Sequence, residues 1–263
     1  MPDLQFVFVT GATGAIGKAI AANIAKHRHY HVMLIVRDEE KAIRTADEIK
    51  DETGNRVEYA IVDLADHRQI YEFARSWKKP LDVLINNAAA SPRQRKENKY
   101  GIELQFATNV LGYFAMMDAF SDHLIRSTQS RIVNVASYWA GGLDLSDLQF
   151  MTRKYDNDAA YRQSKQADRM LSRAFADRFM GHSVFVNACH PGDVNSRLSN
   201  DLGFGGFETP DQGAETPVWL ATGPAGIENT GKYFEHKRET ICQFSQDKDS
   251  VTKLYHICAD MLT

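Results

Sequence analysis

The chain has 263 residues with 31 basic and 34 acidic side chains, which gives a formal net charge of −3 at pH 7. This balance excludes a basic nucleic-acid-binding surface, and the hydrophobic share of 43% excludes a disordered chain. There is no apolar run of membrane-spanning length, no signal peptide and no cysteine pair at metal-ligand spacing, so we expect a cytoplasmic protein without a metal.

Short β-branched segments alternate with helical segments along the first 190 residues. Expected strands cover residues 4–9, 31–36, 57–62, 81–85, 131–136 and 183–188, and expected helices cover residues 18–26, 39–50, 66–77, 101–125 and 159–180. This alternation predicts a parallel sheet of about seven strands with helices on both faces, in a single Rossmann-type doubly wound α/β domain over residues 1–263. Ligands of such folds bind beyond the carboxyl ends of the strands.

A glycine-rich turn follows the first strand. Its glycines allow a tight turn and a close approach of the backbone to a pyrophosphate, and the following helix offers free N–H groups and a positive dipole end. The sequence therefore predicts a dinucleotide phosphate site here, with an ordinary βα turn as the alternative. The residues concerned are Gly11, Thr13, Gly14, Ala15, Ile16 and Gly17.

The ends of the second and third strands carry two candidate cofactor contacts. Val36 cannot bind a ribose diol, whereas Arg37 can pair with the 2′-phosphate of NADP, so the sequence favours NADP over NAD. The alternative is a solvated arginine neutralised by Asp38. Asp63 can accept a hydrogen bond from the adenine amine or cap the following helix.

Tyr161 and Lys165 lie four residues apart at the start of the expected helix 159–180, and therefore on one face of it. A nearby ammonium and an oxidised nicotinamide both favour a phenolate, so Tyr161 can donate a proton to a carbonyl oxygen or take one from an alcohol. Ser137 follows the fifth strand, where its hydroxyl can bond the same oxygen, although an ordinary loop serine is the alternative.

Asn109 lies inside the expected helix 101–125, where asparagine disfavours helical structure. We interpret it as the mark of a local kink, with an ordered water that links Lys165 to solvent. The alternative is an exposed asparagine on a regular helix.

Small residues follow the fourth strand, and they leave room for a flat ring or a sugar beside the backbone; they are Asn87, Ala88 and Ala89. After the sixth strand, Pro191 and Gly192 predict a rigid turn against the nicotinamide, and Val194 and Ser196 can bond its carboxamide. His190 is expected to be structural rather than catalytic. Residues 195–216 combine Gly, Asn and Asp with apolar side chains, which suits a mobile substrate lid over an apolar pocket.

Taken in this order, these motifs resemble the short-chain dehydrogenase/reductase family over nearly the whole chain. The resemblance rests on residues 10–17, Asp63 with Leu64, residues 86–89, Asn109, Ser137, Tyr161 with Lys165, and Pro191 with Gly192. It implies a catalytic tetrad of Asn109, Ser137, Tyr161 and Lys165, with the last two also contacting the cofactor, and a cofactor contact at Asp63 and Leu64.

Residues 101–112, 213–216 and 231–234, and the long spacing from Ser137 to Tyr161, resemble the retinol dehydrogenase-like branch, which includes a WW-domain oxidoreductase. That branch implies NADPH-dependent reduction of lipophilic aldehydes and ketones. The resemblance also implies a homodimer or homotetramer through the helices 101–125 and 159–180, or a monomer.

The spacing Gly11-x-x-Gly14-x-x-Gly17 departs from this branch and is typical of extended, epimerase-like members; Ala15 and Ala89 also stand where glycine is usual. A nucleotide-sugar epimerase or dehydratase is therefore one alternative function. A non-catalytic NADP-sensing protein is another. The leading hypothesis is a reductase of a small apolar carbonyl compound that uses NADPH.

Overall fold

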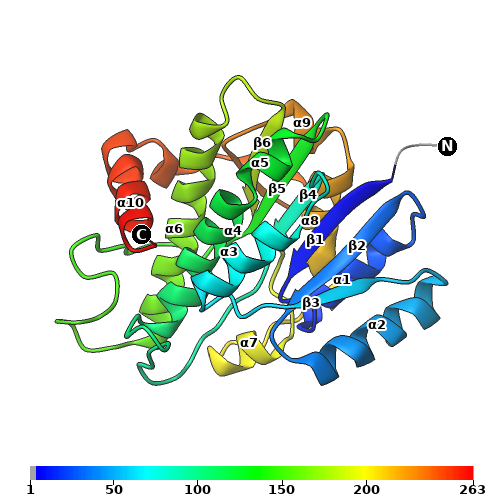
Figure 1. Cartoon of the computed structure of the whole chain (residues 1–263). Coiled ribbons are helices and arrows are strands. Elements are labelled where there is room, and N and C mark those ends of the chain that lie inside the picture. The colour runs from blue at the N-terminus through cyan, green and yellow to red at the C-terminus, as the bar shows by residue number, and fades with distance from the viewer. Residues whose placement is uncertain (1–3, 263) are drawn as a thin grey trace.

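The computed structural model describes residues 4–262, and its centre is one twisted sheet (Figure 1). The strand order is β3-β2-β1-β4-β5-β6-β7-β8, and every pair is parallel except β7 with β8. The strands are β1 (Gln5–Thr10), β2 (Tyr30–Val36), β3 (Glu58–Ile61), β4 (Val83–Asn86), β5 (Ser130–Val135), β6 (Val184–Cys189), β7 (Lys232–Glu235) and β8 (Arg238–Thr240).

Helices cover both faces of the sheet, as expected for parallel strands that are apolar on both sides. One layer holds α1 (Ala15–Ala25), α2 (Glu39–Thr53) and α8 (Pro210–Thr222). The other holds α3 (His67–Ser76), α4 (Gly112–Ala119), α5 (Ser121–Ile125), α6 (Asn157–Arg178) and α10 (Lys248–Asp260). Shorter pieces are a π-helix (Phe106–Leu111), α7 (Arg197–Asp201), α9 (Ala225–Glu228) and a 3₁₀-helix (Gln243–Ser245).

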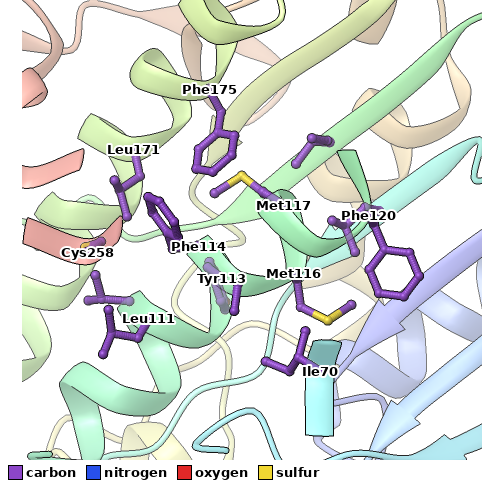
Figure 2. Packing of buried hydrophobic residues seen from close by; sticks show 14 of the residues in the cluster. Ile70, Leu111, Tyr113, Phe114, Met116, Met117, Phe120, Leu171, Phe175 and Cys258 are labelled. Atoms are coloured by element: carbon purple, nitrogen blue, oxygen red, sulfur yellow. The ribbon is translucent and has the colours of Figure 1, made fainter. Parts of the chain in front are cut away.

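The larger of the two cores lies between the sheet and the second helical layer. Figure 2 shows its centre, where Phe114 and Met117 of α4 lie beside Phe175 of α6 and Cys258 of α10 reaches the same cluster. The rings of Phe114 and Phe175 meet edge-on, with their centroids 5.1 Å apart. This packing holds α4 and α6 side by side on the face of the sheet, next to β4 and β5.

The chain order reverses between β1 and β4, which lie next to each other in the sheet. Doubly wound folds have their ligand crevice at such a switch point, at the carboxyl edge, which here carries the turns after β1, β4, β5 and β6. The predicted fold class and the predicted place of the ligand edge are both in keeping with this topology.

Three features of the fold differ from the sequence prediction. The sheet has eight strands, because β7 turns back into β8 through His236 and Lys237, both at positive φ (46° and 60°). Neither residue type is typical of a hairpin turn, so the turn carried no sequence signal. The predicted helix 101–125 is divided into the π-helix, α4 and α5, with a break at Phe120.

The predicted lid segment, residues 195–216, is also shorter in the structure. Its last part begins α8, where Thr209 caps the helix through Gln212 and Pro210 follows the cap. Gly213 and Ala214 of α8 are buried, and α8 packs against α1. The part that is free of the core layers is therefore residues 195–209.

Candidate functional site

The turn after β1 is tightly packed against the end of β4. Gly11 has φ of 64°, and a Cβ on it would lie 2.6 Å from Cα of Ala88. A Cβ on Gly17 would lie 2.5 Å from the carbonyl oxygen of Gly11 and 2.6 Å from Nδ2 of Asn87. These two glycines are therefore required by the close approach of the turn to β4.

The first turn of α1 presents its N–H groups to the crevice. Gly14 precedes the helix, and the first i→i−4 bond is donated by the N–H of Lys18. The N–H groups of Ala15, Ile16 and Gly17 come before that bond, so they can meet an anionic group. Thr13 and Gly14 are partly open beside them. A pyrophosphate fits this cradle.

The side chain of Arg37 is exposed directly after β2 and has no hydrogen bond or ion pair within residues 4–262. Asp38 is instead occupied with the following helix, where it accepts a hydrogen bond from the N–H of Lys41 and pairs with its ammonium at 3.1 Å. Asp38 therefore does not pair with Arg37 here, although an exposed Arg37 also agrees with the alternative of a solvated arginine. The guanidinium is free to meet a phosphate.

Asp63 and Leu64 have different surroundings at the end of β3. One carboxylate oxygen of Asp63 accepts a hydrogen bond from the N–H of Ala65 at 3.0 Å, so Asp63 stabilises its own turn and does not cap α3, whose N-cap position is Asp66. The side chain of Leu64 is buried in the core and packs against Gly112. Only the backbone of Leu64 can contribute to a ligand site.

The segment after β4 is hydrogen-bonded both to Thr10 at the end of β1 and to Asn109 of the π-helix. Thr10 accepts hydrogen bonds at its Oγ1 from the N–H groups of Asn87 and Ala88, at 2.8 and 3.1 Å. Two residues beyond Ala88, the amide of Asn109 bonds Ala90 twice: Oδ1 accepts from its N–H at 2.8 Å, and Nδ2 donates to its carbonyl at 3.1 Å. Ala89 lies between these two attachments.

Asn109 is fully buried at the centre of the π-helix, so the alternative of an exposed asparagine is wrong. Its Nδ2 also donates to Oγ of Ser164 on α6, at 3.1 Å. A π-turn widens the helix by one residue, and here it points the amide at the β4 segment and at α6 together. The side chain thus connects the three segments that surround the crevice.

Ser137 and Tyr161 meet at the carboxyl end of β5. Ser137 lies next to the phenol of Tyr161, and both side chains are buried, with Tyr161 7% exposed. Burial raises the pKa of Tyr161, the neighbouring hydroxyl of Ser137 lowers it, and the charges of Asp168 and Asp193 raise it further. Without its ligands the site therefore holds Tyr161 as a phenol.

Lys165 follows Tyr161 by one helical turn on α6, and its buried ammonium lies close to the ring of Tyr161. Nζ is 5.9 Å from the centroid of that ring and 5.0 Å from the ring of Tyr113. It donates to the carbonyl of Val135 and to Oδ2 of Asp168, both at 2.9 Å. The structure therefore brings all four residues of the predicted tetrad to one end of the crevice.

Arg169 holds the backbone of Ser137 in place. Its guanidinium is stacked over the ring of Tyr233, 3.5 Å from the centroid, and Nη2 donates to the carbonyl of Ser137. His190 is buried nearby, and burial lowers the pKa of its imidazole to about 3. A neutral imidazole packed edge-on against Tyr138 fits the structural part expected of His190.

The turn after β6 is shaped by an acidic side chain. Gly192 has φ of 111°, and a Cβ on it would lie 2.0 Å from Oε2 of Glu208, which accepts a hydrogen bond from the N–H of Asp193. Val194 is buried and pairs with Glu208 in a short parallel bridge. Gly192 is therefore required to admit Glu208, and Pro191 sits before it at the crevice.

Ser196 caps α7 and is not free. Its Oγ accepts from the N–H of Ser199 at 3.1 Å, and Oγ of Ser199 accepts in return from the N–H of Ser196 at 2.8 Å. Three residues after α7, Phe204 packs against Trp139 with ring centroids 4.2 Å apart. Residues 195–209 thus lie over the segment that follows Ser137.

Several residues at the site were missed in the sequence, although some carried a signal. Asp168 is three positions from Lys165, which places both on one helical face. Arg169 and Glu208 carried none, because each acts through a contact with a distant segment. Phe204 belongs to the apolar side chains expected in the lid, but its partner Trp139 could not be read from the sequence.

The model of the short chain dehydrogenase family matches residues 5–203, which include the phosphate turn and the tetrad. The chain belongs to the short-chain dehydrogenase/reductase family. Within it, the chain is like the retinol dehydrogenases: it is 37% identical to retinol dehydrogenase 13 of Mus musculus, over 89% of this chain and 76% of that protein. It is 30% identical to retinol dehydrogenase 14 of Homo sapiens, over 97% of this chain and 85% of that one.

Solved structures agree on the fold of this family member. A protein from Mycobacterium paratuberculosis superimposes with a TM-score of 0.83 at 25% identity, covering 99% of this chain and 94% of its own. A short chain dehydrogenase from Escherichia coli CFT073, complexed with NADPH, gives a TM-score of 0.72 at 22% identity, over 90% of this chain and 98% of its own. Across residues 4–262 we find no helix with the length and apolar character to cross a bilayer.

Proposed function

We propose that this oxidoreductase reduces an apolar aldehyde or ketone to an alcohol, or runs the reverse reaction, with NADP(H) and with Tyr161 as the acid/base. The observation that carries the proposal is the position of Ser137 beside Tyr161 at the carboxyl end of β5, with the ammonium of Lys165 5.9 Å from the centroid of the Tyr161 ring. Two hydroxyl groups that converge on one point can both bond a single carbonyl oxygen.

Each residue of the tetrad has a separate task in this proposal. The bound cofactor supplies or accepts the hydride. Ser137 orients the carbonyl oxygen, and Tyr161 donates its proton to that oxygen as the alcohol forms. The ammonium of Lys165 stabilises the phenolate that remains. Asn109 holds the segment after β4 in place through Ala90 and so maintains the wall of the site.

NADP is proposed over NAD because of Arg37. A free guanidinium at the end of β2 matches the 2′-phosphate, and no carboxylate stands there to bind a ribose diol, since Asp38 is occupied by Lys41. The pyrophosphate is assigned to the N-terminus of α1, and the nicotinamide to the side of the crevice near Pro191, Gly192, Val194 and Ser196.

The substrate is proposed to be apolar because Phe204 of the segment 195–209 lies against the segment that follows Ser137. Phe204 packs against Trp139, two residues after Ser137, and we assign this segment as the substrate lid. The relatives support the same class, since the proteins named retinol dehydrogenase act on a lipophilic alcohol.

The test measures NADPH consumption with a panel of aromatic, aliphatic and terpenoid aldehydes and ketones, and with NADH in parallel. Wild type should prefer NADPH, and Tyr161→Phe should lower kcat by about 10²–10⁴-fold, because the proton donor is lost. Tyr71→Phe is the control. The hydroxyl of Tyr71 on α3 bonds Asp118 on α4 at 2.6 Å and has no part in the proposed chemistry, so kcat should be retained.

Two other outcomes would replace the proposal. Turnover of a nucleotide sugar without net NADPH consumption would indicate an epimerase; the described helices and strands after His190 are few and join the same sheet or its helical layers, which disfavours a separate sugar-binding region. Tight NADPH binding without turnover of any carbonyl would indicate an NADP sensor.

A further inference from the structure

Lys165 is paired inside the protein with a carboxylate from its own helix. Nζ and Oδ2 of Asp168 are 2.9 Å apart, and the two side chains are 3% and 0% exposed. Within the described residues, the other hydrogen-bond acceptor of Nζ is the neutral carbonyl of Val135. The positive charge next to Tyr161 is therefore accompanied by a negative charge at the same depth.

Asp168 has few other polar neighbours. Its Oδ1 is buried and has no hydrogen-bond partner within residues 4–262. Burial raises the pKa of Asp168 to about 7, and the neighbouring Lys165 opposes that rise. A buried carboxylate with one bare oxygen is costly for the fold, so the ion pair with Lys165 is its main compensation.

The titratable groups that face this pair from other elements are neutral at pH 7. They are Tyr113 of α4, Cys189 of β6 and Cys258 of α10, and burial raises the pKa of each of them. On α6 itself the neighbour is Tyr161, which also senses Asp193 from the turn after β6. Within the described residues, the charge balance around Tyr161 is therefore set chiefly by Lys165, Asp168 and Asp193.

The pairing changes what Lys165 does to Tyr161. A lone buried ammonium attracts a phenolate strongly, whereas an ammonium with a carboxylate 2.9 Å away acts as a dipole whose field falls off faster. We propose that Asp168 is a positioning residue that holds the ammonium of Lys165 and sets the pH at which Tyr161 loses its proton. This inference rests on the proposed function and deepens it.

The consequence is a preference for one form of Tyr161. With Asp168 ionised, the pair keeps Tyr161 as the phenol, which is the form that donates a proton during reduction. Oxidation of the alcohol needs the phenolate, so in wild type it should require a more alkaline medium.

Asp168→Asn tests this with little change of volume. In alcohol oxidation with saturating NADP⁺, the acidic limb of the pH profile of kcat/KM should shift to lower pH by about one unit. At pH values on this limb, the phenolate fraction of Tyr161 is then about tenfold larger than in wild type. Asp177→Asn is the matched control, because Asp177 lies on the same helix and forms a surface ion pair with Arg173. Its profile should equal that of wild type.

A second measurement needs no turnover. The ultraviolet absorbance of phenolate is titrated in wild type and Asp168→Asn, and the same titrations with Tyr161→Phe added are subtracted to isolate Tyr161. The phenolate of Tyr161 should form at lower pH in Asp168→Asn, within the pH range where circular dichroism shows both proteins folded. If Asp168→Asn does not fold, Asp168→Ser is used, and the same shift is expected; Asp168→Glu should restore the wild-type titration.

The outcomes separate the two proposals. A shifted titration without turnover of any carbonyl would support the role of Asp168 and overturn the proposed function. Normal turnover with an unmoved titration and an unmoved pH profile would overturn the role of Asp168 and leave the proposed function standing. A lower kcat with an unchanged pH profile would show that Asp168 is merely structural.

Discussion

In the proposed cofactor site Arg37 acts through its charge alone, because its exposed side chain makes no contact that the fold needs. A hydrogen bond to a charged group contributes about 1.5–3 kcal/mol. We therefore expect Arg37→Gln to lower kcat/KM for NADPH by about 10–100-fold, and to leave kcat/KM for NADH unchanged. Steady-state kinetics with each cofactor measures this directly.

The matched control is Arg56→Gln. Arg56 is also exposed, but it precedes β3 and so lies at the opposite edge of the parallel sheet. Arg56→Gln should change kcat/KM for neither NADPH nor NADH. An equal loss with both cofactors in Arg37→Gln would mean that Arg37 does not distinguish the 2′-phosphate.

Single residues were predictable where they belong to a local pattern. The spacing of Tyr161 and Lys165 specifies one helical face, and Ser137 follows a strand whose end lies at the same edge. Asp168 satisfied the same spacing rule, yet a charged residue on a helix is ordinarily exposed. Only the packing of α4 and α10 over α6 shows that it is buried.

At the level of elements, the π-helix is the clearest difference between expectation and structure. The sequence predicted a disturbance at Asn109 but not its form, because a π-turn depends on where the amide finds partners. Those partners, Ala90 and Ser164, are 19 and 55 positions away along the chain. The start of α8 is the opposite case: Thr209, Pro210 and Gln212 form a recognisable helix start, so that boundary was predictable.

Asn109→Ala should destabilise the junction of the π-helix with the segment after β4. It removes the two hydrogen bonds to the half-buried backbone of Ala90 and the one to the buried hydroxyl of Ser164, at about 0.5–1.5 kcal/mol for each bond. We expect the free energy of unfolding to fall by that order in urea denaturation, with an unchanged m-value.

Asn23→Ala is the control for this prediction. Asn23 of α1 also bonds a backbone carbonyl, that of Ala19, but it is partly exposed, so water can replace the lost bond. Its loss should stay within about 0.5 kcal/mol. Equal losses in the two variants would show that the Asn109 clamp adds no stability.

On the scale of the whole molecule, the parallel sheet of the first six strands with helices on both faces follows from the alternation of strands and helices together with the crossover rule. The C-terminal part does not, because β8 and α10 follow the last crossover and are placed by packing alone. Yet α10 covers the outer side of the helical layer that contains α4 and α6. Val251, Leu254 and Cys258 are buried against the α4 and α6 layer.

The position of α10 bears on how copies of this chain can associate. The ring of Tyr255 lies 5.1 Å from that of Phe114 on α4 and 5.6 Å from that of Phe175 on α6, and its hydroxyl accepts a hydrogen bond from Arg178. Figure 2 shows Cys258 beside Leu111 and Leu171 in the same cluster. The apolar surface of α4 and α6 is thus covered by the chain's own helix.

A dimer through the helices 101–125 and 159–180 would have to displace α10 and re-expose these rings, which costs the apolar area that α10 buries. We therefore expect a monomer of 29.6 kDa in multi-angle light scattering across a wide range of protein concentration. Leu254→Asp places a charge in the fully buried contact and should release α10, so that the exposed face of α4 and α6 drives association and the measured mass rises. A stable wild-type dimer, or a monomeric and folded Leu254→Asp variant, would contradict this assignment of α10 as the cover of that face.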